Sequence, residues 1–377
     1  MKHNIILVLF LFLSPMVHAE SETISIKHAQ FSEMLNFNVM LPPNYEKNGT
    51  KSYILLFDFH PRANIYLNGM HDWLSHNGEW PWLETIIVTP AFGNSVGVLF
   101  DETGKTTPLL DFFENMLFPE LDRKYRTNGF RIMSGFRVNA TIVLSALINK
   151  PEMINVYLAT SPQLSDNYAG ILSTAANKLK ILNDKPRFLY FTHGDSIKEE
   201  TQQESYYKFQ MILKSSSPKS LEWHQQSFNE NYFMSMPLLT TILGIEKLFN
   251  DIHSGLEPTS LISQQGIPEI VKHYKYLSKE KYGFEVSPKK SIENRGLYLL
   301  KNSHEQGIIL LKEATELFPD DAYSYHNLAR GYAEIGDYEN AVLQQKIAVS
   351  KSKTMLTWHR NRMFEFLDTF TRELTNK

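Results

Sequence analysis

Short apolar runs recur through the first two thirds of the chain, and segments with a helical period lie between them. Several of these runs are continuously apolar, which is typical of strands buried on both faces of a sheet. They cover residues 37–43, 53–59, 84–90, 130–136, 155–162, 187–194 and 221–228, with helical patterns at 109–125 and 140–150. Strands that alternate with helices predict an α/β domain with a mostly parallel sheet flanked by helices.

The pattern changes after about residue 250, where strand-like runs stop and the remaining sequence is helical in period. Residues 253–268 are rich in Ser, Gly and Pro, which indicates a linker or a loosely packed connection. An internal repeat follows, with a spacing of 34 residues at Tyr298/Tyr332, Gly307/Ala341 and Ala314/Ala348. That spacing is the period of the tetratricopeptide helix-turn-helix unit, in which small residues let paired helices approach. A generic amphipathic helix hairpin is the alternative. An array this short should pack on the preceding domain or on a partner.

The first residues, MKHNIILVLFLFLSPMVHAE, have the features of a secretory signal peptide. Lys2 gives a positive start, residues 5–13 are apolar, and Ala19 is a small residue at the expected cleavage point. The apolar core is too short to span a bilayer comfortably. We therefore expect a periplasmic or secreted protein, cleaved after Ala19, with no transmembrane segment in the mature chain.

Composition narrows the classes of function further. Lys and Arg number 38 against 41 Asp and Glu, so the basic excess that a nucleic-acid-binding face needs is missing. The chain has no cysteine, which excludes disulfides, thiol catalysis and cysteine metal sites. No histidine pair has the spacing of a metal-binding motif. We expect neither a metal nor a cofactor.

The stretch RIMSGFRVNA, residues 131–140, lies where a predicted strand turns into a predicted helix. In α/β hydrolases this turn carries the nucleophile in a G-x-S-x-G motif, with small residues on both sides. The sequence has Gly135 and Asn139 at the flanks, but Arg137 stands at the nucleophile position. Arginine cannot attack an acyl carbon because its guanidinium is always protonated and has no free lone pair.

Several pieces in the same order resemble the esterases of the ferric-enterobactin-esterase type, in the branch with C-terminal tetratricopeptide repeats. The resemblance covers roughly residues 24–350. It is carried by YILLFDFH, WPWLETIIVTPAFGNS, FPELDRKYRTNGFRIMSGF, YLATSPQL and VKHYKYLSKEKYGFEVSPKKSIENRGLYLL. It implies an α/β-hydrolase fold, with the nucleophile at Arg137 and the acid at Asp195 in THGDS. It places the catalytic histidine in FNENYFMSMP, residues 228–237, which contains none.

The resemblance also suggests which residues surround a pocket at this turn. The candidates are Phe59, His60, Arg137, Val138, Ser161, His193 and Tyr232. His60 would lie on the oxyanion loop, either lining the pocket or capping the loop. Ser134 and Ser161 are alternative nucleophiles, but Ser134 should point into the sheet and Ser161 should pack or hydrogen-bond. Arg137 could bind a carboxylate or phosphate, or it could pair with Asp195 and close a dead site.

Five segments and three functions follow as expectations. The segments are a signal peptide (1–19), an esterase-like α/β-hydrolase domain (20–250), a linker with helix (251–290), tetratricopeptide-like repeats (291–353) and a C-terminal helix (354–377). The first function is a pseudo-esterase that binds a small, anionic or ester-like ligand or a protein partner. The alternatives are an active carboxyl-ester or thioester hydrolase with a rearranged site, and an envelope scaffold that recruits a partner through its repeats.

Overall fold

The computed structural model describes residues 21–43, 45, 49–76, 81–103 and 108–376. Its contacts divide the chain into two compact units, Met1–Glu246 and Lys247–Lys377. The signal peptide expected at residues 1–19 lies outside the described residues.

The first unit is built on one mixed sheet. Its strands are β1 (Ser21–Lys27), β2 (Met34–Met40), β3 (Tyr53–Asp58), β4 (Thr85–Pro90), β5 (Thr127–Phe136), β6 (Val156–Thr160), β7 (Arg187–His193) and β8 (Leu221–Ser227). Their order across the sheet is β1-β2-β4-β3-β5-β6-β7-β8. Strand β2 is antiparallel to β1 and β4, and every other neighbouring pair is parallel. All seven predicted runs form strands, and β1 is an addition.

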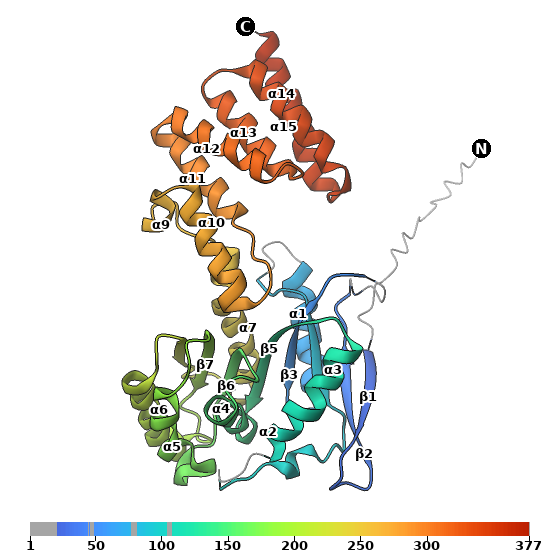
Figure 1. The fold of residues 1–377 in the computed structure, drawn as a ribbon, viewed down its shortest axis with the longest axis vertical. Helices are drawn as coiled ribbons and strands as arrows, with labels where there is room; N and C mark the ends of the chain where they lie inside the picture. Colours follow the sequence, from blue (N-terminus) through green and yellow to red (C-terminus); the bar gives the residue numbers. More distant parts are fainter. Residues whose placement is uncertain (1–20, 44, 46–48, 77–80, 104–107, 377) are drawn as a thin grey trace, which may run out of the picture. The chain divides into compact units, whose positions relative to one another are not determined.

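Helices cover both faces of this sheet, which confirms the predicted fold class. They are α1 (Ala63–His76), α2 (Pro108–Phe112), α3 (Phe118–Lys124), α4 (Val138–Asn149), α5 (Ile171–Lys180), α6 (Gln203–Ser216) and α7 (Met236–Leu248), which runs across the boundary between the units. Short 3₁₀ turns lie at Val96–Leu99, Ser165–Gly170, Glu200–Gln202 and Phe233–Ser235. Helices α2, α3 and α4 lie in front of the sheet in Figure 1, and α1 lies behind it. The helical pattern predicted at 109–125 is interrupted by a π-helical turn at Phe113–Leu117, between α2 and α3.

The central strands and helix α4 form the core. Strands β3, β4 and β6 are buried along their whole length, as continuous apolar runs predict. In α4, every residue from Ala140 to Ile148 is buried, so this helix is enclosed on all sides. A helix enclosed in this way has little freedom to shift, and its first residue follows directly from the turn at Arg137.

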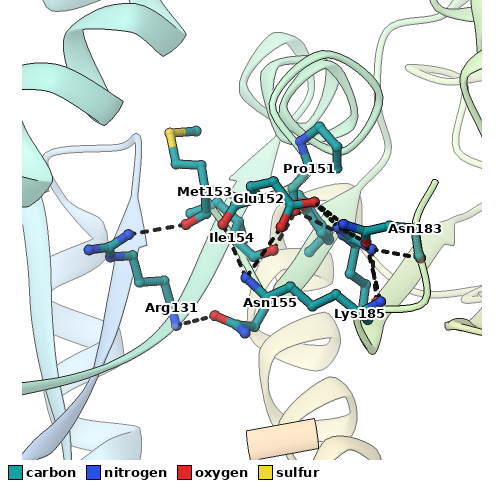
Figure 2. Close-up of polar contacts among 10 residues, drawn as sticks. Arg131, Pro151, Glu152, Met153, Ile154, Asn155, Asn183 and Lys185 are labelled. Carbon is teal, nitrogen blue, oxygen red and sulfur yellow. Dashed lines mark hydrogen bonds and ion pairs between the residues drawn. The ribbon is translucent and has the colours of Figure 1, made fainter. Parts of the chain in front are cut away.

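A polar cluster joins β5, β6 and β7 near their amino ends (Figure 2). Arg131 and Asn155 are joined by two hydrogen bonds of 3.0 Å, one from each backbone N–H. The Arg187 side chain is fully buried, and its guanidinium donates to the Glu152 carboxylate at 2.5 Å and the Asn183 side chain at 2.9 Å. It also donates to the carbonyls of Pro151 and Lys185, both at 2.8 Å. These bonds fix the strand order at the edge opposite the strand-to-helix turn.

The second unit is helical throughout its described residues. Its helices are α8 (Asn250–His253), α9 (Leu261–Gln264), α10 (Ile267–Tyr276), α11 (Lys289–Asn302), α12 (His304–Leu317), α13 (Ala322–Glu334), α14 (Tyr338–Lys351) and α15 (Thr357–Thr375). A π-helical turn at Leu277–Tyr282 and a 3₁₀ turn at Ser352–Thr354 complete it. The segment 251–290, expected as a linker with helix, contains α9, α10 and all of α8 except its first residue, and it buries Ile270, Tyr274 and Tyr282. The segment packs as part of the second unit, because these apolar side chains are buried in it.

Small residues lie where the helices of the second unit approach closely. A Cβ atom added to Gly307 would lie 2.6 Å from the backbone nitrogen of Leu300, and one added to Gly296 would lie 2.7 Å from the Leu311 side chain. Ala314, Ala341 and Ala348 are completely buried. The pairs α11/α12 and α13/α14 therefore form two closely packed hairpins, and α15 packs against α14.

Candidate functional site

The turn between β5 and α4 keeps the strained geometry of a nucleophile elbow. Arg137 has φ 58° and ψ −122°, a conformation that a residue with a Cβ atom rarely adopts. A Cβ atom on Gly135 would lie 2.5 Å from the carbonyl carbon of Asn139, so only glycine fits there. Such strain persists only where the surroundings enforce it, and it is typical of functional sites.

Backbone hydrogen bonds hold the turn from three sides. The Arg137 N–H donates to the Thr160 carbonyl at the end of β6, at 3.0 Å. The Arg137 carbonyl accepts from the N–H of Thr141 at 3.1 Å and from that of Gln163 at 3.4 Å. None of these three hydrogen bonds depends on the side chain at position 137. The elbow therefore forms although its central residue is not a nucleophile.

The Arg137 side chain is exposed, and an aromatic ring lies beside it. Its guanidinium carbon is 5.9 Å from the centre of the Phe233 ring, within the range of a cation–π contact. The Phe233 ring in turn packs on Phe136, the last residue of β5, at 4.7 Å between centroids. Phe233 belongs to the segment after β8, where the resemblance implies a histidine. Within the part of the chain that the structure describes, Arg137 forms no ion pair.

The loop after β7 contains two carboxylates, and only one of them is buried. Asp195, the expected acid, is exposed and accepts a hydrogen bond from the Glu230 N–H at 3.1 Å. The predicted pairing of Asp195 with Arg137 is not found. Glu199 is 1% exposed and accepts from the Gly194 N–H at 3.1 Å and the Tyr206 hydroxyl at 3.2 Å. Glu199 is therefore the buried acid at this edge of the sheet, and the sequence reasoning missed it.

His193 lies at the end of β7, beside Tyr206 and Glu199. Its ring stacks on the Tyr206 ring at 4.8 Å, and its Nε2 lies 2.7 Å from the Gln225 side-chain nitrogen. Burial lowers the pKa of His193, and the Glu199 carboxylate opposes that shift. Burial and Glu199 both raise the pKa of Tyr206, whereas the charge of Arg137 lowers it. His193, Tyr206, Glu199 and Arg137 thus form one electrostatic neighbourhood.

The loop after β3 turns inward rather than towards a ligand. Asp58 is buried and accepts the His60 N–H at 2.8 Å, and burial raises the Asp58 pKa to about 6. His60 itself is exposed, and its Nδ1 accepts the Arg62 N–H at 3.2 Å, so it caps the loop. Phe59 packs on Phe57 at 5.0 Å and belongs to the core. The His60 N–H in this loop is therefore already occupied by the Asp58 carboxylate.

The other residues expected around the pocket do not gather at the Arg137 side chain. Ser161 is buried, and its hydroxyl lies 3.6 Å from the Met236 sulfur, so it packs behind the turn. Ser134 is buried in β5 and hydrogen-bonds to Asp58. Tyr232 is 88% exposed; its neighbour Phe233 meets Arg137 instead. Val138 is partly buried as the first residue of α4.

The arrangement suits anion binding better than acyl transfer. A serine hydrolase needs a nucleophile hydrogen-bonded to a base and free donors for the oxyanion. Here the elbow carries a permanent cation, and neither Ser134 nor Ser161 has an imidazole as its hydrogen-bond partner.

In the described ranges, no group of three or more His, Asp or Glu side chains could hold a metal ion. The same ranges contain no helix long and apolar enough to cross a membrane.

Comparison with known proteins identifies the fold. No family model and no curated protein matches the sequence. The chain is similar in structure to an IroE-like serine hydrolase from Shewanella oneidensis, with 17% identity, a TM-score of 0.59, and 79% of this chain and 100% of that chain covered. An uncharacterised protein from Capnocytophaga ochracea gives 14% identity and a TM-score of 0.62, over 94% of this chain and 100% of that one. The siderophore hydrolase EstA from Aspergillus nidulans gives 15% identity and a TM-score of 0.50, over 66% of this chain and 99% of that one. The chain therefore has an α/β-hydrolase-type fold, a mostly parallel sheet flanked by helices, followed by a helical C-terminal region.

Proposed function

We propose that the protein is an exported pseudo-esterase, which has no hydrolase activity and binds a small anionic ligand at Arg137. The observation that carries this proposal is an exposed guanidinium at the elbow with no ion pair among the described residues. The elbow lies at the carboxyl ends of parallel strands, where open α/β sheets bind their ligands. The forked donors of arginine, next to the start of a helix, suit a carboxylate or a phosphate.

The side chains around the elbow support the loss of hydrolysis. Position 137 is not a serine, and residues 228–237 contain no histidine. Loss of the catalytic serine or of the catalytic histidine from a serine protease lowers turnover by roughly 10⁶-fold. Phe233, which lies against the elbow, cannot transfer a proton. An active carboxyl-ester or thioester hydrolase with a rearranged site is the alternative, and it would need a nucleophile elsewhere in the chain.

Two measurements on the mature protein, residues 20–377, test this function. Turnover of p-nitrophenyl acetate should not exceed that of buffer, and calorimetric titration should detect acetate or phosphate binding that Arg137→Ala removes. Arg126→Ala is a matched control, because Arg126 is a cation stacked on Tyr45 at 4.3 Å in the same unit. Turnover that a single substitution abolishes would favour the active hydrolase. Equal anion binding by wild type and Arg137→Ala would exclude the elbow as the site.

A second candidate function rests on the helical unit. Helices α14 and α15 expose large apolar side chains, with Leu343, Trp358 and Phe364 each more than half exposed. Together with the 34-residue repeat spacing, these side chains favour tetratricopeptide-like repeats that recruit a protein partner in the cell envelope. A partner that co-purifies with Arg137→Ala but not with Trp358→Ser would assign that function to the helices. Loss of the partner with both variants, or with neither, would not fit this scaffold.

Export is part of the same proposal. The signal-peptide pattern of residues 1–19 supports periplasmic location or secretion. Expression of the full chain in a Gram-negative host, followed by fractionation and N-terminal sequencing, should give a periplasmic protein that begins at Glu20. A cytoplasmic protein that retains Met1 or Lys2 would contradict it.

A further inference from the structure

The segment after β8 presents exposed apolar side chains, and one of its rings, Phe233, lies beside the Arg137 guanidinium. Tyr232 is 88% exposed and Met234 is 71% exposed, on either side of Phe233 in the sequence. Large apolar side chains in water carry a free-energy cost, and a contiguous group of them marks an interaction site. Ligand sites combine such apolar walls with a few placed polar groups. The elbow and this segment together provide both.

Contacts on both sides keep Phe233 in place. Its ring packs on Phe136, which is fixed at the end of β5. The segment then enters α7 through Met236, which is completely buried and lies against the Ser161 hydroxyl. A short 3₁₀ turn, with a hydrogen bond of 2.9 Å from the Ser235 N–H to the Tyr232 carbonyl, connects the two. The Phe233 ring is therefore a preformed wall, and binding would cost little ordering of this segment.

The charges around the guanidinium favour a ligand with a single negative charge. Arg137 supplies one positive charge, and the neighbouring β7 loop carries two carboxylates, the buried Glu199 and the exposed Asp195, against one cation, the exposed Lys198. Glu199 reaches the same neighbourhood through its hydrogen bond with Tyr206. A doubly charged phosphate would meet more repulsion from these groups than a monocarboxylate would. A carboxylate also matches the two parallel N–H groups of a guanidinium.

We infer that the ligand class of this site is an apolar monocarboxylate, whose carboxylate pairs with Arg137 and whose hydrocarbon or aromatic body lies on Phe233 and the side chains beside it. The inference rests on the proposed function and adds the ligand class to it. The site then has two separable parts, since the guanidinium binds the charge and the Phe233 wall selects the body. Acetate uses the first part only, whereas benzoate uses both.

The experiment compares three probes on the mature protein: acetate, benzoate and uncharged methyl benzoate. Calorimetric titration in buffer of low ionic strength should show that benzoate binds about tenfold or more tightly than acetate, as burial of one ring face implies. Methyl benzoate should bind at least tenfold more weakly than benzoate. Arg137→Ala should abolish binding of both acids. Phe233→Ala should reduce benzoate binding to the level of acetate and leave acetate binding unchanged.

Matched variants keep the result interpretable. Tyr232→Ser changes a side chain that is 88% exposed, so little packing depends on it, and it should weaken benzoate binding less than Phe233→Ala does, because Phe233 is the ring beside Arg137. Phe364→Ala removes an exposed phenylalanine from α15 and should change nothing. Equal affinity for acetate and benzoate in wild type would overturn the ligand class but leave anion binding intact. Binding of phosphate but of neither acid would overturn the ligand class alone. No binding of acetate, benzoate or phosphate would overturn both proposals, and equal binding of methyl benzoate and benzoate would overturn the role of the charge at Arg137.

Discussion

Gly135 offers the sharpest test of how the elbow is built. A Cβ atom at this position would lie 2.5 Å from the carbonyl carbon and oxygen of Asn139 and 2.8 Å from the Ala140 nitrogen. Favourable carbon contacts lie at about 3.5–4.0 Å, so the helix backbone would have to move by about 1 Å. Helix α4 is buried on all sides and cannot yield cheaply. Overpacking of a core costs about 1–3 kcal/mol, and we place Gly135→Ala at the upper end, about 3 kcal/mol, since backbone must move.

The assay is thermal unfolding followed by tryptophan emission. Trp358 is the only tryptophan beyond residue 246, so a Trp358→Phe background makes the emission report the first unit. A loss of about 3 kcal/mol lowers Tm by about 6–12 °C in a domain of this size. The matched control is Gly69→Ala within α1, where an added Cβ atom meets nothing within 4 Å. It should gain about 0.5–1 kcal/mol from the better helix former.

A Gly135→Ala variant that unfolds within about 2 °C of the parent protein would contradict this account of the elbow. That result would mean that α4 moves freely at its first turn and that the strain at Arg137 is not enforced by packing. A drop in Tm with unchanged acetate binding at 20 °C would show that the turn recovers its geometry in the folded state. Loss of both would tie the ligand site to the close approach of strand and helix.

The other predictions concern charge and chemistry elsewhere. Arg187→Ala should lower the free energy of unfolding, measured in urea, by about 2–4 kcal/mol, because it leaves buried carbonyls unpaired. Glu152→Ala removes the same ion pair, but the Glu152 side chain is 57% exposed, so it should lower that free energy by less than about 1 kcal/mol. Burial raises the pKa of Glu293 to about 7, so the free energy of unfolding of the helical unit should fall as pH rises from 4.5 to 7. Burial lowers the pKa of His326 to about 4, so the same free energy should fall as pH drops from 6.5 to 4. Glu293→Gln should remove the loss of stability between pH 4.5 and 7 and keep the loss at lower pH, to which His326 contributes about 3 kcal/mol from pH 7 to below pH 4; an unchanged pH profile in urea unfolding would contradict this. Arg137→Ser should not hydrolyse p-nitrophenyl acetate, since no base is supplied, and clear turnover would reveal one.

Much of the architecture follows from the sequence because burial on both faces leaves a clear pattern. Strands β3, β4 and β6 are continuously buried, and their apolar runs are unbroken. Strand β1 escaped notice because it is an edge strand with only two fully buried positions, Ile24 and Ile26. Two short apolar residues separated by polar ones do not stand out from a loop.

The candidate site was less predictable than the fold, because loop conformations determine which side chains lie at the elbow. The elbow was located because strand, turn and helix are contiguous in sequence. The choice between Asp195 and Glu199 depends on which carboxylate a loop turns inward, and the hydrogen bonds from Gly194 and Tyr206 decide that. Tyr232 and Phe233 are adjacent aromatic residues, and a single 3₁₀ turn selects Phe233 for the contact with Arg137. No spacing or composition signal records such a choice.

The backbone of the elbow has a practical consequence for spectroscopy. Its conformation is held by main-chain bonds to Thr160, Thr141 and Gln163, none of which involves the side chain at 137. Because the chain has no cysteine, Arg137→Cys would introduce a single thiol at a defined, exposed point. A fluorophore or spin label attached there would report directly on what approaches the carboxyl ends of the strands.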